Sequence, residues 1–223
     1  MSDKWSDLKG QEQSFKFKEW YRPGMGTENV GPFLSSFISM VRPQRILEVG
    51  AGFTTPHIID GVKNNEVLMI DENNFNQEYL KTKYDPKVII IDNYAIGDPY
   101  IESANIFFSK YKFVNIINDK FQGKSKELMN EYGKFDFVWF DCGGPKEYEE
   151  FIKEYWDICS EYVIFHFTYC NGQPTESLVS ILKNISGPHF RLDIVEPHKK
   201  NQGSITIIRK APVPILQKSL HKK

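Results

Sequence analysis

The chain has 223 residues, 40% hydrophobic and 26% charged, which is the size and balance of one globular domain with its own core. Its 28 Lys and Arg nearly balance 29 Asp and Glu, so a formal net charge of -1 offers no long-range attraction to nucleic acid. No apolar run approaches the roughly 20 residues that span a bilayer, and the N-terminus has no signal-peptide pattern, so no membrane association is expected.

The chain contains three cysteines, Cys142, Cys159 and Cys170. Their number is odd and their spacing does not match a metal site, which fits a reducing compartment better than a disulfide framework. The protein is therefore predicted to be cytoplasmic.

Short apolar runs alternate with helix-length segments, which is the pattern of an α/β fold. A helix is predicted over 29–40, ahead of the first strand, with Pro32 in its first turn. The helix-length connections predict a mostly parallel sheet with helices on both faces, and the last two strands are close enough to form an antiparallel hairpin. Seven strands are predicted, at 45–49, 66–71, 112–117, 135–141, 162–166, 190–196 and 204–209.

The predicted organisation is a main domain over 29–210 with shorter segments on both sides. Residues 1–28 are an N-terminal segment that we expect to act as a flap over the active site. The stretch 87–108 is longer than an ordinary connection, so it is treated as an insertion that can serve as a lid. Residues 211–223 contain two prolines and several basic residues, and we expect a flexible tail outside the core.

A glycine turn follows the first predicted strand. Gly50 and Gly52 precede a helix that is expected to begin near Thr54, and the missing side chains let the backbone approach a ligand closely. A dinucleotide-binding turn requires a third glycine three positions after the second, but Thr55 comes at that place, so NAD is disfavoured. A tight strand-to-helix turn without a ligand is the structural alternative.

Together with Glu48, the two glycines match the first motif of class I S-adenosylmethionine-dependent methyltransferases, acidic-x-Gly-x-Gly. The C-terminal hairpin is also typical of that family, and the resemblance extends over about 31–210. It implies a Rossmann-like fold, S-adenosylmethionine as cofactor and S-adenosylhomocysteine as product. It also implies that Glu48, Gly50 and Gly52 lie near the methionine part of the cofactor.

The same resemblance suggests further cofactor contacts. Asp71, or its neighbour Glu72, lies at the end of the predicted strand 66–71 and would accept hydrogen bonds from the two ribose hydroxyls. Asp119 follows the third predicted strand and would bind the adenine amino group, although an Asp after a strand is also a common turn former. Thr27 would contribute at the methionine end, or it could simply belong to the start of the first helix.

The methyl acceptor is expected near the ends of the fourth and fifth predicted strands, where Asp141 and His166 stand. His166 is the candidate general base and Asp141 its orienting partner, whereas a structural histidine in the core is the alternative. The strand 135–141 resembles the fourth strand of catechol-type O-methyltransferases. Those enzymes add an Asp-Asn pair after the fifth strand to bind a divalent metal, but Phe167 and Thr168 follow His166 here. We therefore expect no metal, although Asp141 and His166 could belong to a site for a softer metal.

These observations predict methyl transfer to an oxygen of a small, natural-product-like acceptor. Transfer to nitrogen or to a carboxylate is the nearest alternative, and an NAD-dependent oxidoreductase is a more distant one. A nucleic-acid methyltransferase is disfavoured because no Asn/Asp-Pro-Pro-aromatic motif follows the fourth strand. Binding without chemistry also remains open, since fold does not determine function, and a homodimer is compatible with the sequence.

Overall fold

The computed structural model describes residues 20–75, 83–93, 108, 110–199 and 203–210. Helices and strands alternate along most of the chain. In chain order the elements are α1 (Val30–Val41), β1 (Arg45–Val49), α2 (Thr54–Phe75), β2 (Lys87–Asp92), β3 (Val114–Asn118), α4 (Ser125–Tyr132), β4 (Phe135–Phe140), α5 (Pro145–Tyr155), the short helix η2 (Trp156–Ile158), β5 (Cys159–His166), β6 (Tyr169–Cys170), β7 (Gln173–Pro174), α6 (Glu176–Asn184), β8 (His189–Val195) and β9 (Ser204–Lys210).

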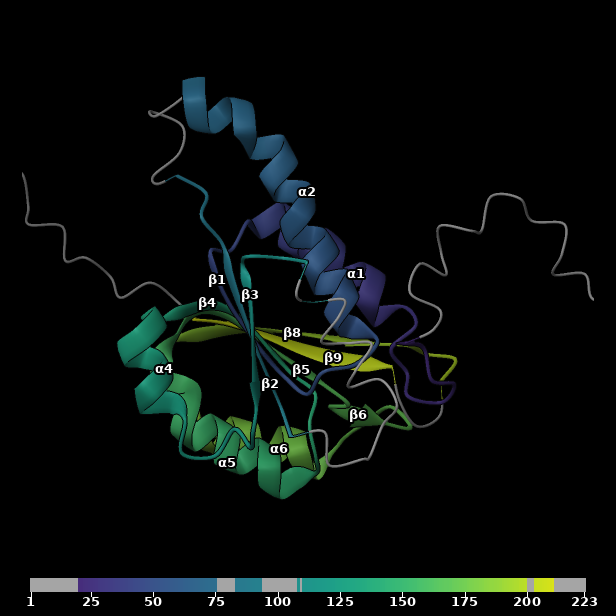
Figure 1. Cartoon of the computed structure of the whole chain (residues 1–223). Helices are drawn as coiled ribbons and strands as arrows, with labels where there is room; N and C mark the ends of the chain where they lie inside the picture. Colours follow the sequence, from purple (N-terminus) through teal and green to yellow (C-terminus); the bar gives the residue numbers. More distant parts are fainter. Residues whose placement is uncertain (1–19, 76–82, 94–107, 109, 200–202, 211–223) are drawn as a thin grey trace, which may run out of the picture.

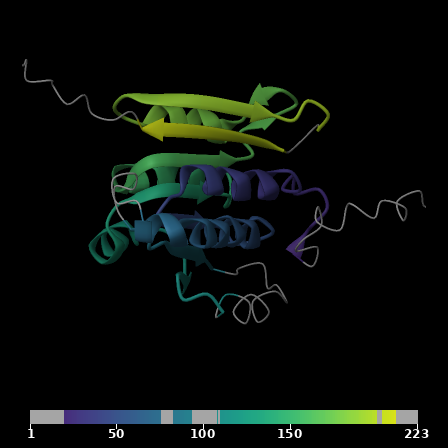
Figure 2. The same ribbon diagram turned by 90° about the horizontal axis from the view of Figure 1, so that it is seen from above.

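The described residues form one seven-stranded sheet in the order β3-β2-β1-β4-β5-β9-β8. The five strands from β3 to β5 are parallel, and β9 runs antiparallel to both of its neighbours. Helices α1 and α2 lie on one face of the sheet, while α4, α5 and α6 lie on the other (Figures 1 and 2). The predicted fold class, a mostly parallel sheet with helices on both faces and a C-terminal antiparallel hairpin, is confirmed.

Helices α1 and α2 pack closely against each other and against the sheet. Leu34 and Ile38 of α1 are fully buried, as expected for the apolar face of the predicted helix. Gly61 lets the two helices approach, because a Cβ atom there would lie 2.7 Å from the backbone oxygen of Ser35. Asn65 of α2 donates to the carbonyl of Ile38 at 2.9 Å, which closes this contact.

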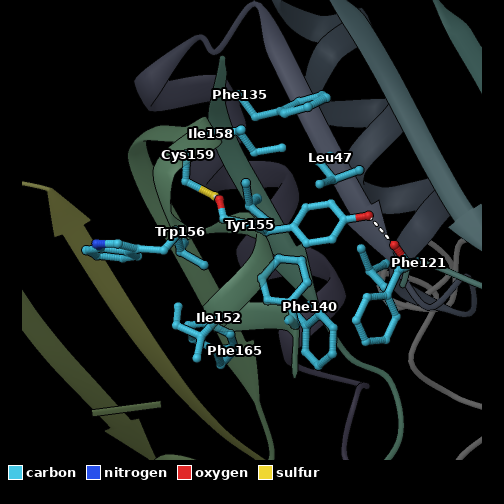
Figure 3. Close-up of a cluster of buried hydrophobic side chains, with 14 of the residues drawn as sticks. Leu47, Phe121, Phe135, Phe140, Ile152, Tyr155, Trp156, Ile158, Cys159 and Phe165 are labelled. Carbon is cyan, nitrogen blue, oxygen red and sulfur yellow. Dashed lines mark hydrogen bonds between the residues drawn. The ribbon is translucent and has the colours of Figure 1, made fainter. Parts of the chain in front are cut away.

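The opposite face carries an aromatic core between the sheet and α5 (Figure 3). The rings of Phe140 and Phe151 are 4.3 Å apart, and Phe151 stacks on Tyr155 at 4.7 Å. The hydroxyl of Tyr155 donates to the carbonyl of Phe121, which satisfies its polar atom inside the core. This packing fixes β4 and α5, the elements on either side of Asp141.

The second strand of the sheet is not the predicted one. Residues 66–71 belong to helix α2, where Val67 and Leu68 are exposed, and the strand is instead Lys87–Asp92. A strand between two parallel neighbours needs two buried faces, and Val88 to Ile91 provides them with side chains at most 1% exposed. The prediction that 87–108 is an insertion is therefore wrong for 87–92, and 94–107 lies outside the described residues.

The other predicted strands differ from the observed ones by a few residues at their ends. The N-terminal segment is described only from Trp20 onward, and the predicted tail 211–223 lies outside the described residues. Within the part that is described, no helix combines the length and apolar character needed to cross a bilayer.

Candidate active site

The carboxyl ends of the parallel strands β1, β2, β3, β4 and β5 meet at one edge of the sheet, and the candidate residues gather there. The turn after β1 is held against the end of β4. Gly50 has φ +94°, and a Cβ atom on it would lie 2.2 Å from the carbonyl oxygen of Asp141. The amide of Asp141 in turn donates to the carbonyl of Val49 at 3.0 Å. Glycine is therefore required at position 50 by conformation and by space.

Gly52 has a different role from Gly50. A Cβ atom on it would meet nothing within 4 Å, so the space beside the turn is open for a ligand. The amide of Gly52 donates to Oγ1 of Thr55 at 2.9 Å. Thr55, which comes at the place of the third glycine, thus braces the turn, and this supports the distinction from a dinucleotide-binding site.

Asp92 is a site residue that the sequence reasoning missed. It ends β2, and its Oδ2 accepts a hydrogen bond of 2.7 Å from the amide of Ala51 in the glycine turn. This is the position that the family resemblance gives to the ribose-binding acid. The signal was present in the sequence, because four consecutive Val and Ile residues directly precede this aspartate.

A cavity of about 270 Å³ opens beside the turn, at the ends of β1, β2 and β3. Asp92 and Asp119 both line it, which places the predicted Asp119 at the site. The carboxylate of Asp119 also binds the ammonium of Lys124 at 2.8 Å, and the hydrogen bond from Lys124 lowers the pKa of Asp119. Cys142 also lines the cavity, and burial raises the pKa of its thiol to about 11, so the thiol is protonated at neutral pH.

Asp71 and Glu72, the predicted ribose ligands, lie in α2 and not at the end of a strand. Helix α2 starts at the glycine turn and runs back along the sheet, so position 71 lies roughly 25 Å along the helix from Thr54. Their side chains lie outside the described part of the structure. The assignment loses its structural basis, because the second strand of the sheet ends at Asp92 and not at either of them.

Glu48 is fully buried beneath the start of α2. Its Oε1 accepts hydrogen bonds from the hydroxyls of Thr54 at 3.2 Å and Thr55 at 2.9 Å, whereas Oε2 has no hydrogen-bond partner among the described residues. Burial raises the pKa of Glu48 well above its usual value. A buried carboxylate with one unsatisfied oxygen is suited to bind a cationic or donor group of a ligand.

His166 and Asp141 lie together, as predicted. Nδ1 of His166, at the end of β5, is 3.0 Å from Oδ1 of Asp141, directly after β4. The hydroxyl of Tyr148 donates to the carbonyl of His166 at 2.8 Å. The imidazole ring of His166 lies 5.7 Å from the ring of Trp139, measured between centroids. The next residue, Phe167, has φ +52°, an uncommon conformation for a bulky residue, where the chain turns out of the sheet.

The electrostatic surroundings of His166 favour its protonated form. Burial lowers the pKa of this imidazole, but the charge of Asp141, the hydrogen bond to it and the backbone of Gly26 outweigh burial and raise the pKa overall. With Nδ1–H donating to Asp141, Nε2 is left as the acceptor. The backbone of Gly26 lies within hydrogen-bonding reach of the imidazole, and its buried Nε2 forms no bond of good geometry within the described part of the chain.

Thr27 lies in the loop before α1, on the same side of the site as His166. Its side chain is buried, and no described residue bonds to its hydroxyl. The adjacent Glu28 is joined to Lys199, in the turn after β8, by an ion pair of 2.7 Å. The structure therefore places Thr27 next to Gly26, whose backbone lies beside His166.

Chain comparisons give a fold but no family. No family model and no curated protein matches the sequence. PaMTH1, a methyltransferase of Podospora anserina solved with S-adenosylhomocysteine, matches with a TM-score of 0.59 and 13% identity over 90% of this chain and 87% of that one. A Bacillus cereus O-methyltransferase solved with the same ligand gives 0.57 and 14% over 82% and 81%.

The O-methyltransferase TomG of Streptomyces achromogenes, solved with S-adenosylmethionine, gives a TM-score of 0.57 and 14% identity over 90% of this chain and 87% of that one. At sequence identities this low, the similarity shows a shared fold and nothing about the reaction. The similarity extends over at least four fifths of this chain and of each of these structures. The chain therefore has the Rossmann-like fold of class I S-adenosylmethionine-dependent methyltransferases.

Proposed function

We propose that this protein is a methyltransferase that uses S-adenosylmethionine to methylate a hydroxyl oxygen of a small molecule. The observation that carries the proposal is the pair His166–Asp141, 3.0 Å apart, at the carboxyl edge of the sheet beside the glycine turn. An oriented imidazole at this edge is where the fold leads us to expect chemistry. The similar structures solved with S-adenosylhomocysteine or S-adenosylmethionine support the choice of cofactor.

The described residues fit the parts of this cofactor. The unsatisfied Oε2 of Glu48 suits the ammonium of its methionine part, and Thr27 is the second candidate there. Asp92 lines the cavity as a carboxylate that can accept ribose hydroxyls, and Asp119 lies farther along the same cavity for the adenine. Gly50 and Gly52 form the turn between these two ends of the site.

The bound cofactor would supply an electrophilic methyl group on a positively charged sulfur. His166 removes the proton of the acceptor hydroxyl through Nε2, and Asp141 holds the tautomer and stabilises the imidazolium that forms. A raised pKa makes His166 a stronger base, although a smaller fraction of it is unprotonated at neutral pH. The enzyme's other task is alignment, because the transfer is an in-line displacement.

The His166–Asp141 pair favours some classes of methyl acceptor over others. A carboxylate has no proton to lose at neutral pH, so a buried base beside it would add nothing. A hydroxyl needs a base, which is why we favour it over the carboxylate, and a neutral nitrogen acceptor comes second. An NAD-dependent oxidoreductase is disfavoured because Thr55 braces the turn at the place of the third glycine.

We also propose a small-molecule acceptor and a cytoplasmic location. The nearly balanced charge of the chain argues against a nucleic-acid acceptor. The three cysteines are odd in number and lack the spacing of a metal site, which supports a reducing compartment.

Titration calorimetry with S-adenosylmethionine, S-adenosylhomocysteine and NAD tests the cofactor. We expect both adenosyl ligands to bind and NAD not to bind. Gly52→Val should abolish binding without unfolding the protein, because its Cβ atom enters open space. Binding of NAD alone would overturn the proposal. Loss of turnover in His166→Ala with cofactor affinity retained would support the catalytic step, whereas full turnover would contradict it.

A further inference from the structure

A cluster of charged side chains lies next to His166, and the mechanism above does not use it. Its members are Glu28, from the loop before α1, and Glu196 and Lys199, from the turn between β8 and β9. Lys199 Nζ is 2.7 Å from Oε1 of Glu28 and 2.6 Å from Oε2 of Glu196. Asn29 donates to Oε1 of Glu196 at 3.0 Å, so the loop and the turn are tied together at two points.

The sheet register places this cluster near His166, the proposed general base. His166 pairs with Ile205 at the start of β9, and the amide of Phe167 donates to the carbonyl of Ser204 at 3.0 Å. The amide of Glu196 donates to the carbonyl of Gly203 at 3.3 Å, so Glu196 lies across the start of β9 from the end of β5. Although burial raises the pKa of Glu28, the hydrogen bond from Lys199 and the nearby charges, including that of His166, lower it overall.

The two glutamates differ in how completely they are bonded. Both oxygens of Glu196 are occupied, one by Lys199 and one by Asn29. Glu28 uses only Oε1, and its buried Oε2 has no hydrogen-bond partner among the described residues. On the same side of the site, Nε2 of His166 and Oγ1 of Thr27 are also buried without a described partner. Both of those side chains are more than nine-tenths buried.

The charged side chains described near His166 are mainly carboxylates. Asp141, Glu28 and Glu196 carry three carboxylates, and Lys199 is the fixed cation that lies between two of them. Unsatisfied acceptor atoms in a negative, partly desolvated space attract donors and cations and repel anions. They also stabilise the imidazolium that forms when His166 takes up a proton.

We infer that Glu28 determines acceptor specificity: its Oε2 binds an ammonium or another hydrogen-bond donor of the acceptor whose hydroxyl faces His166, so that cationic acceptors are preferred and anionic ones excluded. This inference rests on the proposed function. Because His166 is buried and the backbone of Gly26 lies beside it, the acceptor must displace this loop on entry, and its cationic group then binds Oε2 of Glu28 next to Lys199 on Oε1.

Three phenols that differ only in the charge of their side chain provide the test. Tyramine carries an ammonium, p-cresol is neutral and 4-hydroxyphenylacetate carries a carboxylate. Their binding to the protein saturated with S-adenosylhomocysteine is measured near neutral pH by saturation-transfer NMR with competition. We expect tyramine to bind at least about tenfold more tightly than the carboxylate, with p-cresol between them.

Two variants and a control assign the preference to the cluster. Glu28→Gln keeps the shape of the side chain and should reduce the preference to about threefold or less. Lys199→Met removes the competing cation and should strengthen tyramine binding. Glu127→Gln, at an exposed acid of α4, should leave the preference unchanged.

Each other outcome overturns the inference. A carboxylate that binds as tightly as tyramine, no binding of any of the three phenols, or an unchanged preference in Glu28→Gln would each exclude this role for Glu28. Titration of S-adenosylhomocysteine into every variant tests the proposed function separately. If the cofactor fails to bind the unaltered protein, the methyltransferase proposal fails, and the charge preference must then be judged on the cofactor-free protein.

Discussion

The imidazole of His166 and the carboxylate of Asp141 are joined at 3.0 Å across the ends of β5 and β4. Neither side chain needs a long loop to reach the other, because Phe140 and Phe165, the residues just before them, pair in the parallel strands β4 and β5. The pair is therefore part of the rigid sheet, and its consequences can be tested by pH dependence.

The acidic limb of the pH–rate profile should report the protonation of His166. Asp141 raises the pKa of His166, so Asp141→Asn should move this limb to lower pH. Turnover should also fall by about tenfold or more, because the imidazolium loses its partner. The profile of kcat against pH, measured with an acceptor from the screen, checks this, and an unmoved limb would contradict the assignment of His166 as base.

The raised pKa of His166 also has a consequence for stability. A group whose folded pKa is higher than its unfolded pKa stabilises the folded state fully below the unfolded value, and this contribution is lost as pH rises through the folded value. His166→Gln should therefore remove a decline in unfolding free energy between the ordinary pKa of histidine and the raised one. Urea denaturation at several pH values measures it. An identical decline in the variant would assign it to another group.

Glu48→Gln should have opposite effects on the stability of the protein and on its affinity for the cofactor. Burial raises the pKa of Glu48, so above its unfolded pKa the ionised form costs the folded state stability. The neutral amide should raise the melting temperature of the cofactor-free protein at neutral pH, and it should weaken S-adenosylmethionine binding roughly tenfold or more.

Calorimetry in buffers of different ionisation enthalpy adds a second readout for Glu48. In the unaltered protein, cofactor binding should release a proton as Glu48 ionises beside the ammonium. The release should be absent in the Gln variant. Equal proton release by both proteins would show that Glu48 does not meet the ammonium.

Asp92→Asn and Asp71→Asn form a matched pair that tests the corrected second strand. Asp92 lines the cavity and accepts a hydrogen bond from Ala51, so its variant should bind S-adenosylmethionine roughly tenfold less tightly. Asp71 lies in the second half of α2, and its variant should stay within about twofold of the unaltered protein. The reverse ranking of the two dissociation constants would restore the original assignment.

Gly50→Ala should destabilise the fold more than Gly123→Ala. Both glycines have positive φ, but a Cβ atom at position 50 would lie 2.2 Å from the carbonyl oxygen of Asp141, whereas at position 123 it meets nothing within 4 Å. Gly123→Ala should therefore cost about 1 kcal/mol of unfolding free energy, and Gly50→Ala at least about 2 kcal/mol more. Chemical denaturation compares them, and equal losses would mean that the backbone near Asp141 yields easily.

The fold class and the His166–Asp141 pair could be predicted because both depend on local pattern and strand order. The second strand was misplaced because the runs 67–70 and 88–91 are equally short and apolar, and periodicity cannot separate a buried strand from a helix segment at that length. Branching at Cβ would have identified the strand correctly, since 88–91 is entirely Val and Ile whereas 67–70 contains Leu and Met. Asp92 was not predicted as a site residue because of that single error.

The contact between Glu28 and Lys199 was beyond sequence reasoning for a different reason. These residues are 171 positions apart and both lie in connecting segments. Their approach depends on how the loop before α1 and the turn after β8 are placed by the sheet, and no local pattern encodes it. Sequence patterns locate strand ends well, but they do not determine which loops meet above them.

The backbone contact between Gly50 and Asp141 limits how such a protein can diversify. In the proposed function, methyl donor and base would be positioned by two main-chain segments that touch without intervening side chains, so ordinary substitutions would not tune their separation. New acceptors must be accommodated elsewhere, in the loop that carries Thr27 and Glu28 and in the turn that carries Glu196 and Lys199. Among descendants of this chain, the reaction should be inherited from the sheet, and the choice of substrate should change with those two loops.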